Sequence, residues 1–329
     1  MSLSERKDFS MNDPQNQPID IEDQRAWLID HKNATKMSWT ELAKRIGRSA
    51  GTLSQFGSTN GYAGDEQTIA EQVYRYQQQL FSQAAFEVTA PPLPGFFAGP
   101  TANDIITILT YAQRGRMTVI ATGAGMGKTK TIEHYQASIS NVWKATMRPS
   151  SAGIMNMQLS VLAALGKSDA VGTPAKLSTM IMEKVDRSGG LLVLDEAQHL
   201  SEKSLEEIRS WHDETGVGIA LSGNISVLSR LEGGTRKANF AQLFSRVGMR
   251  IVRAQPLQGD ADALCDAWNI GDDGILQAIR EISQKPGALR GATMTLELAH
   301  MIAASEGQAV NAGHVRDCWA QLSTRQIAA

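Results

Sequence analysis

From Thr122 to Thr129 the chain reads Thr122-Gly123-Ala124-Gly125-Met126-Gly127-Lys128-Thr129. An apolar run that predicts a strand, Met117–Thr122, leads into this stretch, and a predicted helix, Thr129–Ser138, follows it. A glycine-rich turn between a strand and a helix is typical of a P-loop, in which backbone N–H groups and the helix dipole bind phosphate groups. A chance glycine-rich turn would need neither the strand nor the helix, so the stretch predicts a nucleotide-binding α/β domain.

The P-loop interpretation predicts ATP and Mg²⁺ as cofactors. We expect Lys128 to reach the β- and γ-phosphates and the Thr129 hydroxyl to ligate magnesium. Thr122 stands where the motif has its first glycine, so it must adopt a negative φ, and Gly123 could absorb the turn. The predicted nucleotide-binding residues are Thr122, Gly123, Ala124, Gly125, Met126, Gly127, Lys128, Thr129, Lys130 and Asp195.

A pair of carboxylates follows the buried-strand run Leu191–Leu194. We expect Asp195 to hold magnesium together with Thr129, and Glu196 to orient and deprotonate the attacking water. Adjacent acids at a strand end could instead form a solvated turn. Their occurrence downstream of a P-loop favours the catalytic interpretation.

Three further residues are candidates for the same site. Asn224 follows the predicted strand Val217–Ser222 and could position the water, although it could also be a simple turn residue. Arg246 precedes the last predicted strand and could reach the γ-phosphate bound by a neighbouring subunit, with Arg250 as a rival. Arg290 opens a C-terminal helix and could sense the phosphates. Either arginine could instead be a surface cation.

The pattern of strands and helices predicts a mainly parallel sheet. From about Asp104, helical stretches such as Ser204–Glu214 alternate with short apolar strands, which calls for helices on both faces of the sheet. After Pro256 only helical patterns remain. The expected strands are Met117–Thr122, Val142–Met147, Leu191–Asp195, Val217–Ser222 and Met249–Ala254; the expected C-terminal helices are Ala261–Trp268, Gly274–Ser283, Ala288–Ala304 and Val310–Leu322.

The N-terminal region predicts a helix-turn-helix. Ser38-Trp39-Thr40-Glu41 has the pattern of a capping box, Gly47 ends that helix, and Ser49 can cap the next one. This unit could bind DNA, or it could be a protein-docking module. The candidate DNA contacts are Lys44, Arg45, Arg48, Ser49, Thr52 and Gln55 here, together with Arg148 and Lys176 in the P-loop domain.

Composition is that of an ordinary soluble protein. The 329 residues are 42% hydrophobic and 20% charged, with a formal net charge of -2, so DNA contact would require a local basic patch. Two cysteines, a polar start and the lack of a long apolar run favour a cytoplasmic protein without membrane contact. We expect a disordered tail at 1–20, a helix-turn-helix-like domain at 21–86, a linker at 87–100, the ATPase core at 101–256 and a helical lid at 257–329.

These motifs together resemble an AAA+ ATPase of the initiator-like branch, and most closely the family of phage Mu transposition protein B. The resemblance covers nearly the whole chain to about Leu322 and is carried by specific strings. They are Asn141-Val142-Trp143, Asp195-Glu196-Ala197-Gln198-His199-Leu200, Gly223-Asn224, Phe240-Ala241-Gln242-Leu243-Phe244-Ser245-Arg246 and Gln284-Lys285-Pro286-Gly287-Ala288-Leu289-Arg290.

The resemblance implies an ATP-dependent, largely sequence-nonspecific binder of duplex DNA, encoded by a phage or mobile element, that assembles with itself into filaments or rings. It also implies delivery of target DNA to a cognate transposase. Glu196, Asn224, Arg246 and Arg290 match the family's catalytic residues, with Arg246 acting on the neighbouring subunit. Related proteins are more basic around Gly172–Lys176, where this chain has only Lys176. A helicase loader or replication initiator, and a nucleotide-sensing transcription regulator, are the alternatives.

Overall fold

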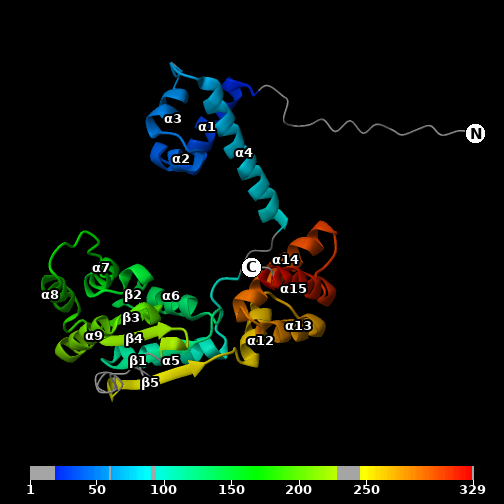
Figure 1. Cartoon of the computed structure of the whole chain (residues 1–329). Helices are drawn as coiled ribbons and strands as arrows, with labels where there is room; N and C mark the ends of the chain where they lie inside the picture. Colours follow the sequence, from blue (N-terminus) through cyan, green and yellow to red (C-terminus); the bar gives the residue numbers. More distant parts are fainter. Residues whose placement is uncertain (1–18, 59–60, 90–93, 228–244, 328–329) are drawn as a thin grey trace, which may run out of the picture. The chain divides into compact units, whose positions relative to one another are not determined.

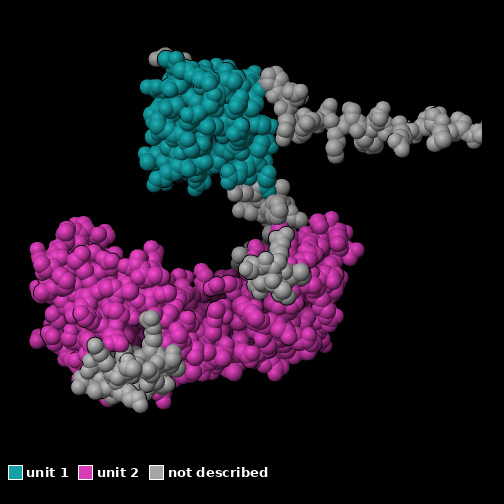
Figure 2. All heavy atoms as spheres, in the orientation of Figure 1, with its two compact units in different colours: residues 1–89 teal, residues 90–329 magenta. Residues whose placement is uncertain are grey.

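The computed structural model describes residues 19–58, 61–89, 94–227 and 245–327 (Figure 1). The chain forms two compact units, one ending at Thr89 and one beginning at Ala90, which are described separately (Figure 2). Residues 1–18 of the predicted tail and residues 240–244 lie outside the described residues, whereas residues 19 and 20, which the prediction also placed in the tail, are described. No helix within the described ranges is long and apolar enough to cross a membrane.

The second unit is built on a five-stranded parallel sheet of order β2-β3-β4-β1-β5. Its strands are β1 (Met117–Thr122), β2 (Val142–Thr146), β3 (Leu191–Asp195), β4 (Gly218–Gly223) and β5 (Val247–Arg253). The predicted α/β fold is therefore confirmed, and strand ends differ from the expected ones by only one or two residues. Because all strands run the same way, their carboxyl ends lie along one edge of the sheet.

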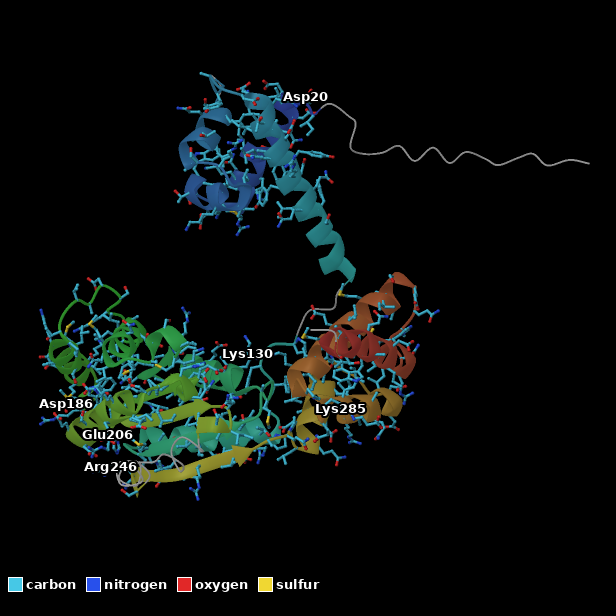
Figure 3. The ribbon with its side chains drawn as sticks, in the orientation of Figure 1. Asp20, Lys130, Asp186, Glu206, Arg246 and Lys285 are labelled. Atoms are coloured by element: carbon cyan, nitrogen blue, oxygen red, sulfur yellow. The ribbon has the colours of Figure 1, made fainter. Side chains whose placement is uncertain are left out.

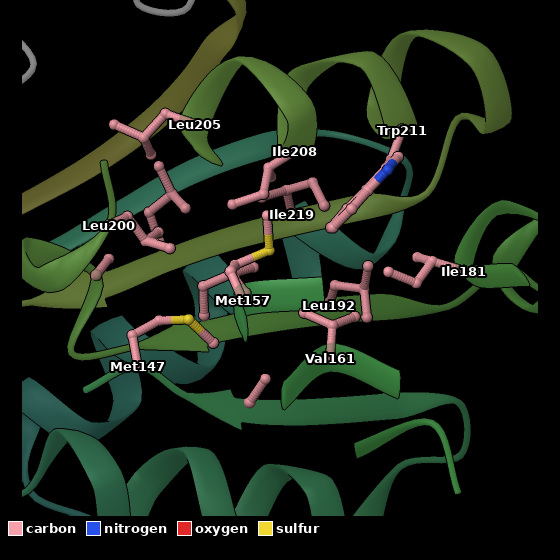
Figure 4. Packing of buried hydrophobic residues seen from close by; sticks show 14 of the residues in the cluster. Met147, Met157, Val161, Ile181, Leu192, Leu200, Leu205, Ile208, Trp211 and Ile219 are labelled. Carbon is pink, nitrogen blue, oxygen red and sulfur yellow. The ribbon is translucent and has the colours of Figure 1, made fainter. Parts of the chain in front are cut away.

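Helices cover both faces of this sheet, as the alternating pattern predicts (Figure 1). On one face, Leu192 and Ile219 pack with Met157, Ile181 and Trp211 from the covering helices (Figure 4). On the other face, strand residues such as Ile120 and Val193 pack with Ile108, Leu109 and Ile132. The covering helices are α7 (Ile154–Ala164), α8 (Pro174–Val185) and α9 (Glu202–Thr215) on the first face, and α5 (Pro100–Gln113) and α6 (Lys128–Ser138) on the second.

A helical lid follows β5 in the same unit and has its own apolar core. Its helices in the described part of the chain are α12 (Gln258–Ala267), α13 (Asp273–Ser283), α14 (Ala288–Ser305) and α15 (Ala312–Ile327). The buried carboxylate of Asp260 connects the lid to the core, because it accepts the N–H of Thr101 at 2.7 Å and that of Leu257 at 2.8 Å. Arg253 reinforces this joint by bonding Thr101 Oγ1 and Asp104, both at 2.8 Å.

The first unit contains α1 (Ile21–Thr35), α2 (Trp39–Ile46), α3 (Ala50–Phe56) and α4 (Glu66–Thr89). The capping box of α2 is present, with Ser38 N–H donating to Glu41 Oε2 at 2.7 Å and Glu41 N–H donating to Ser38 Oγ at 3.2 Å. The Ser49 hydroxyl caps α3 by accepting the Thr52 N–H at 3.1 Å. Helix α1 was not specifically predicted, because a polar residue, Gln24, accompanies Leu28 on its buried side.

A steric test of the sheet–helix packing is Gly218→Ala. A Cβ at Gly218 would lie 2.2 Å from the carbonyl oxygen of Ala112 on α5, and backbone atoms cannot yield as side chains do. We expect the free energy of unfolding to fall by about 1–3 kcal/mol, measured by denaturant titration. Gly271→Ala is the control, because a Cβ there meets nothing within 4 Å. Equal stability of the two variants would contradict the packing.

Candidate nucleotide site

The P-loop joins β1 to α6 at the carboxyl edge of the sheet. Its left-handed turns fall at Gly125 (φ 78°) and Gly127 (φ 82°). Thr122 ends β1 within the strand, so the absent glycine places no demand on its φ. The expectation that Gly123 absorbs the turn is wrong: Gly123 has no positive φ, and a Cβ there would lie 2.3 Å from the carbonyl oxygen of Ala254. Gly123 instead permits close approach of the chain leaving β5.

Lys128 lies folded within this loop. Its Nζ donates to the carbonyl oxygens of Thr122 at 3.2 Å and Gly123 at 3.1 Å, and only 9% of the residue is exposed. Burial lowers the pKa of Lys128, an effect that the Glu196 and Asp195 carboxylates oppose and Arg290 reinforces. A poorly solvated cation inside a phosphate-sized loop is well placed to gain from an anionic ligand.

Asp195 links the P-loop helix to two strands. Its carboxylate, in a residue 1% exposed, accepts hydrogen bonds from Thr129 Oγ1 and Ser222 Oγ, both at 2.9 Å. The Glu196 N–H also donates to Asp195 Oδ1 at 3.1 Å. Magnesium prefers such hard oxygen donors and is usually bound by one or two protein groups plus phosphates, so Thr129 and Asp195 fit the ion chemically.

Glu196 and Asn224 lie beside this cluster and line the same pocket. Glu196 adopts a left-handed conformation (φ 56°), which is uncommon for a residue with a side chain and is often found at functional sites. The Asn224 side-chain oxygen accepts the Ser226 N–H at 2.9 Å, so its carboxamide also supports a turn, as the alternative interpretation expected. Gln198 joins the two residues; the sequence motif contained it, but its role was not predicted.

The lid closes one side of the pocket. The Arg290 N–H donates to the carbonyl oxygen of Gly125 at 3.1 Å, and a Cβ on Gly125 would lie 2.0 Å from the carbonyl oxygen of Gly287. The pocket encloses about 580 Å³, within the range of small-molecule sites. Apolar side chains complete its wall, among them Phe96, Phe97, Met126, Leu289 and Met294.

Two predicted residues point elsewhere. Lys130 lies at the rim with its side chain 83% exposed and pairs with Glu133 at 3.4 Å (Figure 3). Arg246 donates to Asp213 Oδ1 at 2.6 Å and immediately precedes Val247, which pairs with Met117 at the amino end of β1. The length of β1 therefore separates Arg246 from the P-loop of its own chain, a distance on the order of 20 Å.

The candidate DNA contacts are divided between the two units. Lys44, Arg45 and Gln55 are exposed, whereas Arg48 is held by Gln72 on α4. The hydroxyls of Ser49 and Thr52 bond each other at 2.8 Å in the cap of α3. In the second unit Arg148 and Lys176 are exposed, and Arg148 lines an open groove of about 550 Å³ beside β2.

The fold and the P-loop site define an ATPase of the AAA class, and residues 112–231 match the AAA domain family. Residues 245–322 match the family described as Mu B transposition protein, C terminal. The chain is 32% identical over 305 residues to the ATP-dependent target DNA activator B of Escherichia phage Mu, covering 92% of this chain and 96% of that protein. The chain belongs to the Mu B transposition protein family.

One further relative agrees with this placement, and one solved structure is similar in fold. The Mu-like prophage FluMu DNA transposition protein B of Haemophilus influenzae is 32% identical over 271 residues, covering 82% of this chain and 93% of that protein. The crystal structure of CDC6P from Pyrobaculum aerophilum superposes with a TM-score of 0.52 at 16% identity, covering 69% of each chain. The second similarity concerns the fold alone.

The lowered pKa of Lys128 predicts a pH dependence of stability. Below this lowered pKa, Lys128 is charged in both the folded and the unfolded protein. The cost of burying that charge then reduces the free energy of unfolding in full. Between that pKa and the ordinary lysine value the folded state binds fewer protons than the unfolded state, so stability rises with pH. We expect the wild-type free energy of unfolding, relative to Lys128→Met, to increase toward pH 10. A pH-independent difference would contradict the burial effect.

Proposed function

We propose that this protein is an ATPase whose assembly on duplex DNA depends on bound ATP and shows little sequence preference. We further propose that it presents that DNA to a transposase. The similarity to a target DNA activator over 92% of the chain carries the proposal. The P-loop pocket supports it, because residues proposed to act on ATP, such as Lys128, Glu196 and Arg290, line one pocket. A transposition role is favoured over helicase loading or operator recognition by the match at residues 245–322.

In the proposed mechanism, the residues that act on ATP lie mainly at the carboxyl ends of the strands. Lys128 leaves its carbonyl partners and neutralises the β- and γ-phosphates, while the P-loop N–H groups bind the same oxygens. Thr129 and Asp195 hold magnesium, which would neutralise charge on the phosphates. Glu196 accepts a proton from the attacking water, and the Asn224 amide orients that water. Arg290 contributes a second cation from the lid side of the pocket.

The proposed assembly explains the place of Arg246. A cation at the amino edge of the sheet cannot reach its own P-loop, so Arg246 is proposed to act at the pocket of a neighbouring copy. Arg246 would then exchange Asp213 for the γ-phosphate of the neighbour and stabilise charge in the transition state. Hydrolysis would consequently depend on assembly, and assembly on bound ATP.

The DNA contacts would be phosphate contacts and therefore weaken as salt increases. The exposed Lys44 and Arg45 in the first unit and the exposed Arg148 and Lys176 in the second are the proposed cations. The net charge of -2 provides no overall attraction to DNA, so binding would depend on these local cations.

Fluorescence anisotropy with a random-sequence duplex tests the ATP dependence of binding. We expect tight, cooperative, salt-sensitive binding with ATP and little binding with ADP or without nucleotide. Lys128→Ala should abolish the ATP-dependent binding, because it removes the cation that neutralises the phosphates. Binding of equal strength in all three nucleotide states would contradict an ATP-assembled DNA complex, and normal assembly of Lys128→Ala would contradict the P-loop role.

Mixing two inactive variants tests whether Arg246 acts on a neighbour. Arg246→Ala retains its own Glu196, and Glu196→Gln retains its own Arg246, so a mixed interface can contain both groups. At equal ratio we expect about one quarter of wild-type ATP turnover, because one interface in four pairs the intact groups. Arg246→Ala mixed with the double variant is the control and should stay inactive. Absence of recovery at every ratio would contradict action in trans.

A further inference from the structure

Gln198 connects the ends of two adjacent strands inside the candidate site. It lies in the short 3-10 helix Ala197–His199 that follows β3 and Glu196. Its Nε2 donates to Glu196 Oε2, and its Oε1 accepts the N–H of Asn224 at 3.3 Å. A Cβ on Gly223 would lie only 2.4 Å from Gln198 Oε1, so the glycine leaves the space that this side chain occupies.

The partners of Gln198 require a carboxamide. The backbone N–H of Asn224 can only donate a hydrogen bond, and the ionised Glu196 can only accept one. A carboxylate at position 198 would serve the N–H but repel Glu196, whereas an ammonium group would serve Glu196 but leave the N–H unpaired. Glutamine supplies one acceptor and one donor on a single planar group, which fits this bridge.

We propose that Gln198 is a positioning residue that holds the Glu196 carboxylate in its working orientation. The inference rests on the proposed role of Glu196 in hydrolysis. With Oε2 bound by Gln198, Oε1 is left to face the pocket and accept a proton from water. The left-handed backbone of Glu196 and the anchor at the end of β4 together restrict this side chain.

The same contact connects Glu196 to the residue proposed to orient the water. Asn224 follows β4, so any displacement of its backbone when the pocket fills moves the acceptor side of Gln198. Gln198 then carries that displacement to Glu196. The bridge would thereby align the proton acceptor only when the water-orienting amide is in place.

Two variants of the full-length protein, assayed with ATP and duplex DNA, test the proposal. Gln198→Met removes both contacts at similar size, and Gln198→Glu keeps the Asn224 acceptor but repels Glu196. We expect kcat to fall about tenfold or more, as for other supporting hydrogen bonds of catalytic groups, with KM for ATP nearly unchanged. Gln198→Glu should lose at least as much kcat as Gln198→Met, because its carboxylate repels Glu196.

Gln277→Glu is the matched control, because Gln277 Nε2 donates to Glu281 Oε1 at 2.8 Å on the exposed surface of the lid. It should leave kcat and KM for ATP unchanged. Glu196→Gln, measured in parallel, separates the two hypotheses: its full activity would remove the proposed role of Glu196 itself. If Glu196→Gln is inactive as expected, adding Gln198→Met should cause no further loss, since the two residues act as a unit.

Three results would overturn the positioning role while leaving the role of Glu196 intact. A rise in kcat in Gln198→Met would mean that the contact restrains Glu196 rather than aligning it. A further fall in kcat when Gln198→Met is added to Glu196→Gln would assign Gln198 a purely structural role. Unchanged kcat in both variants would show that the bridge has no part in hydrolysis.

Discussion

The buried carboxylate of Asp195 is the constraint on which the nucleotide site depends. An ionised carboxylate that is 1% exposed must be satisfied by donors, and those donors come from Thr129 on the P-loop helix, Ser222 on β4 and the Glu196 backbone. The electrostatic requirement of one side chain therefore fixes α6 against the ends of β3 and β4. Protein groups alone therefore hold Asp195 in position, and such preorganisation reduces the reorganisation needed for hydrolysis.

A second constraint is the close approach of backbones at the glycines of the P-loop. A side chain at Gly123 would collide with the backbone that follows β5, and one at Gly125 would collide with the lid backbone at Gly287. The loop that would surround the phosphates is thus in contact with the only segment through which β5 leads to the lid. The lid also bonds the loop directly, because the N–H of Arg290 donates to the carbonyl oxygen of Gly125.

The sequence predicts the fold well because the deciding signals are local. Buried parallel strands such as Leu191–Asp195 are continuous apolar runs, and the capping box at Ser38 satisfies donors within a few residues. Long-range contacts escaped prediction. Three such contacts depend on residues that only the tertiary fold brings together. They are the close approach at Gly123, the contact of Asp260 with Thr101 and the bridge made by Gln198. Helix α1 escaped prediction for a related reason. Gln24 is polar but buried, and its burial depends on tertiary contacts that the local sequence does not show.

Arg246 shows how topology limits function more strictly than composition does. In a parallel sheet, residues before the strands and residues after the strands lie at opposite edges. Val247 pairs with Met117, so Arg246 lies at the amino edge, whereas the P-loop follows β1 at the carboxyl edge. No rotamer of an arginine spans the length of β1. If Arg246 takes part in hydrolysis, it must therefore do so on another copy of the chain. Any catalytic use of this residue makes the complete active site a property of the assembly rather than of the monomer.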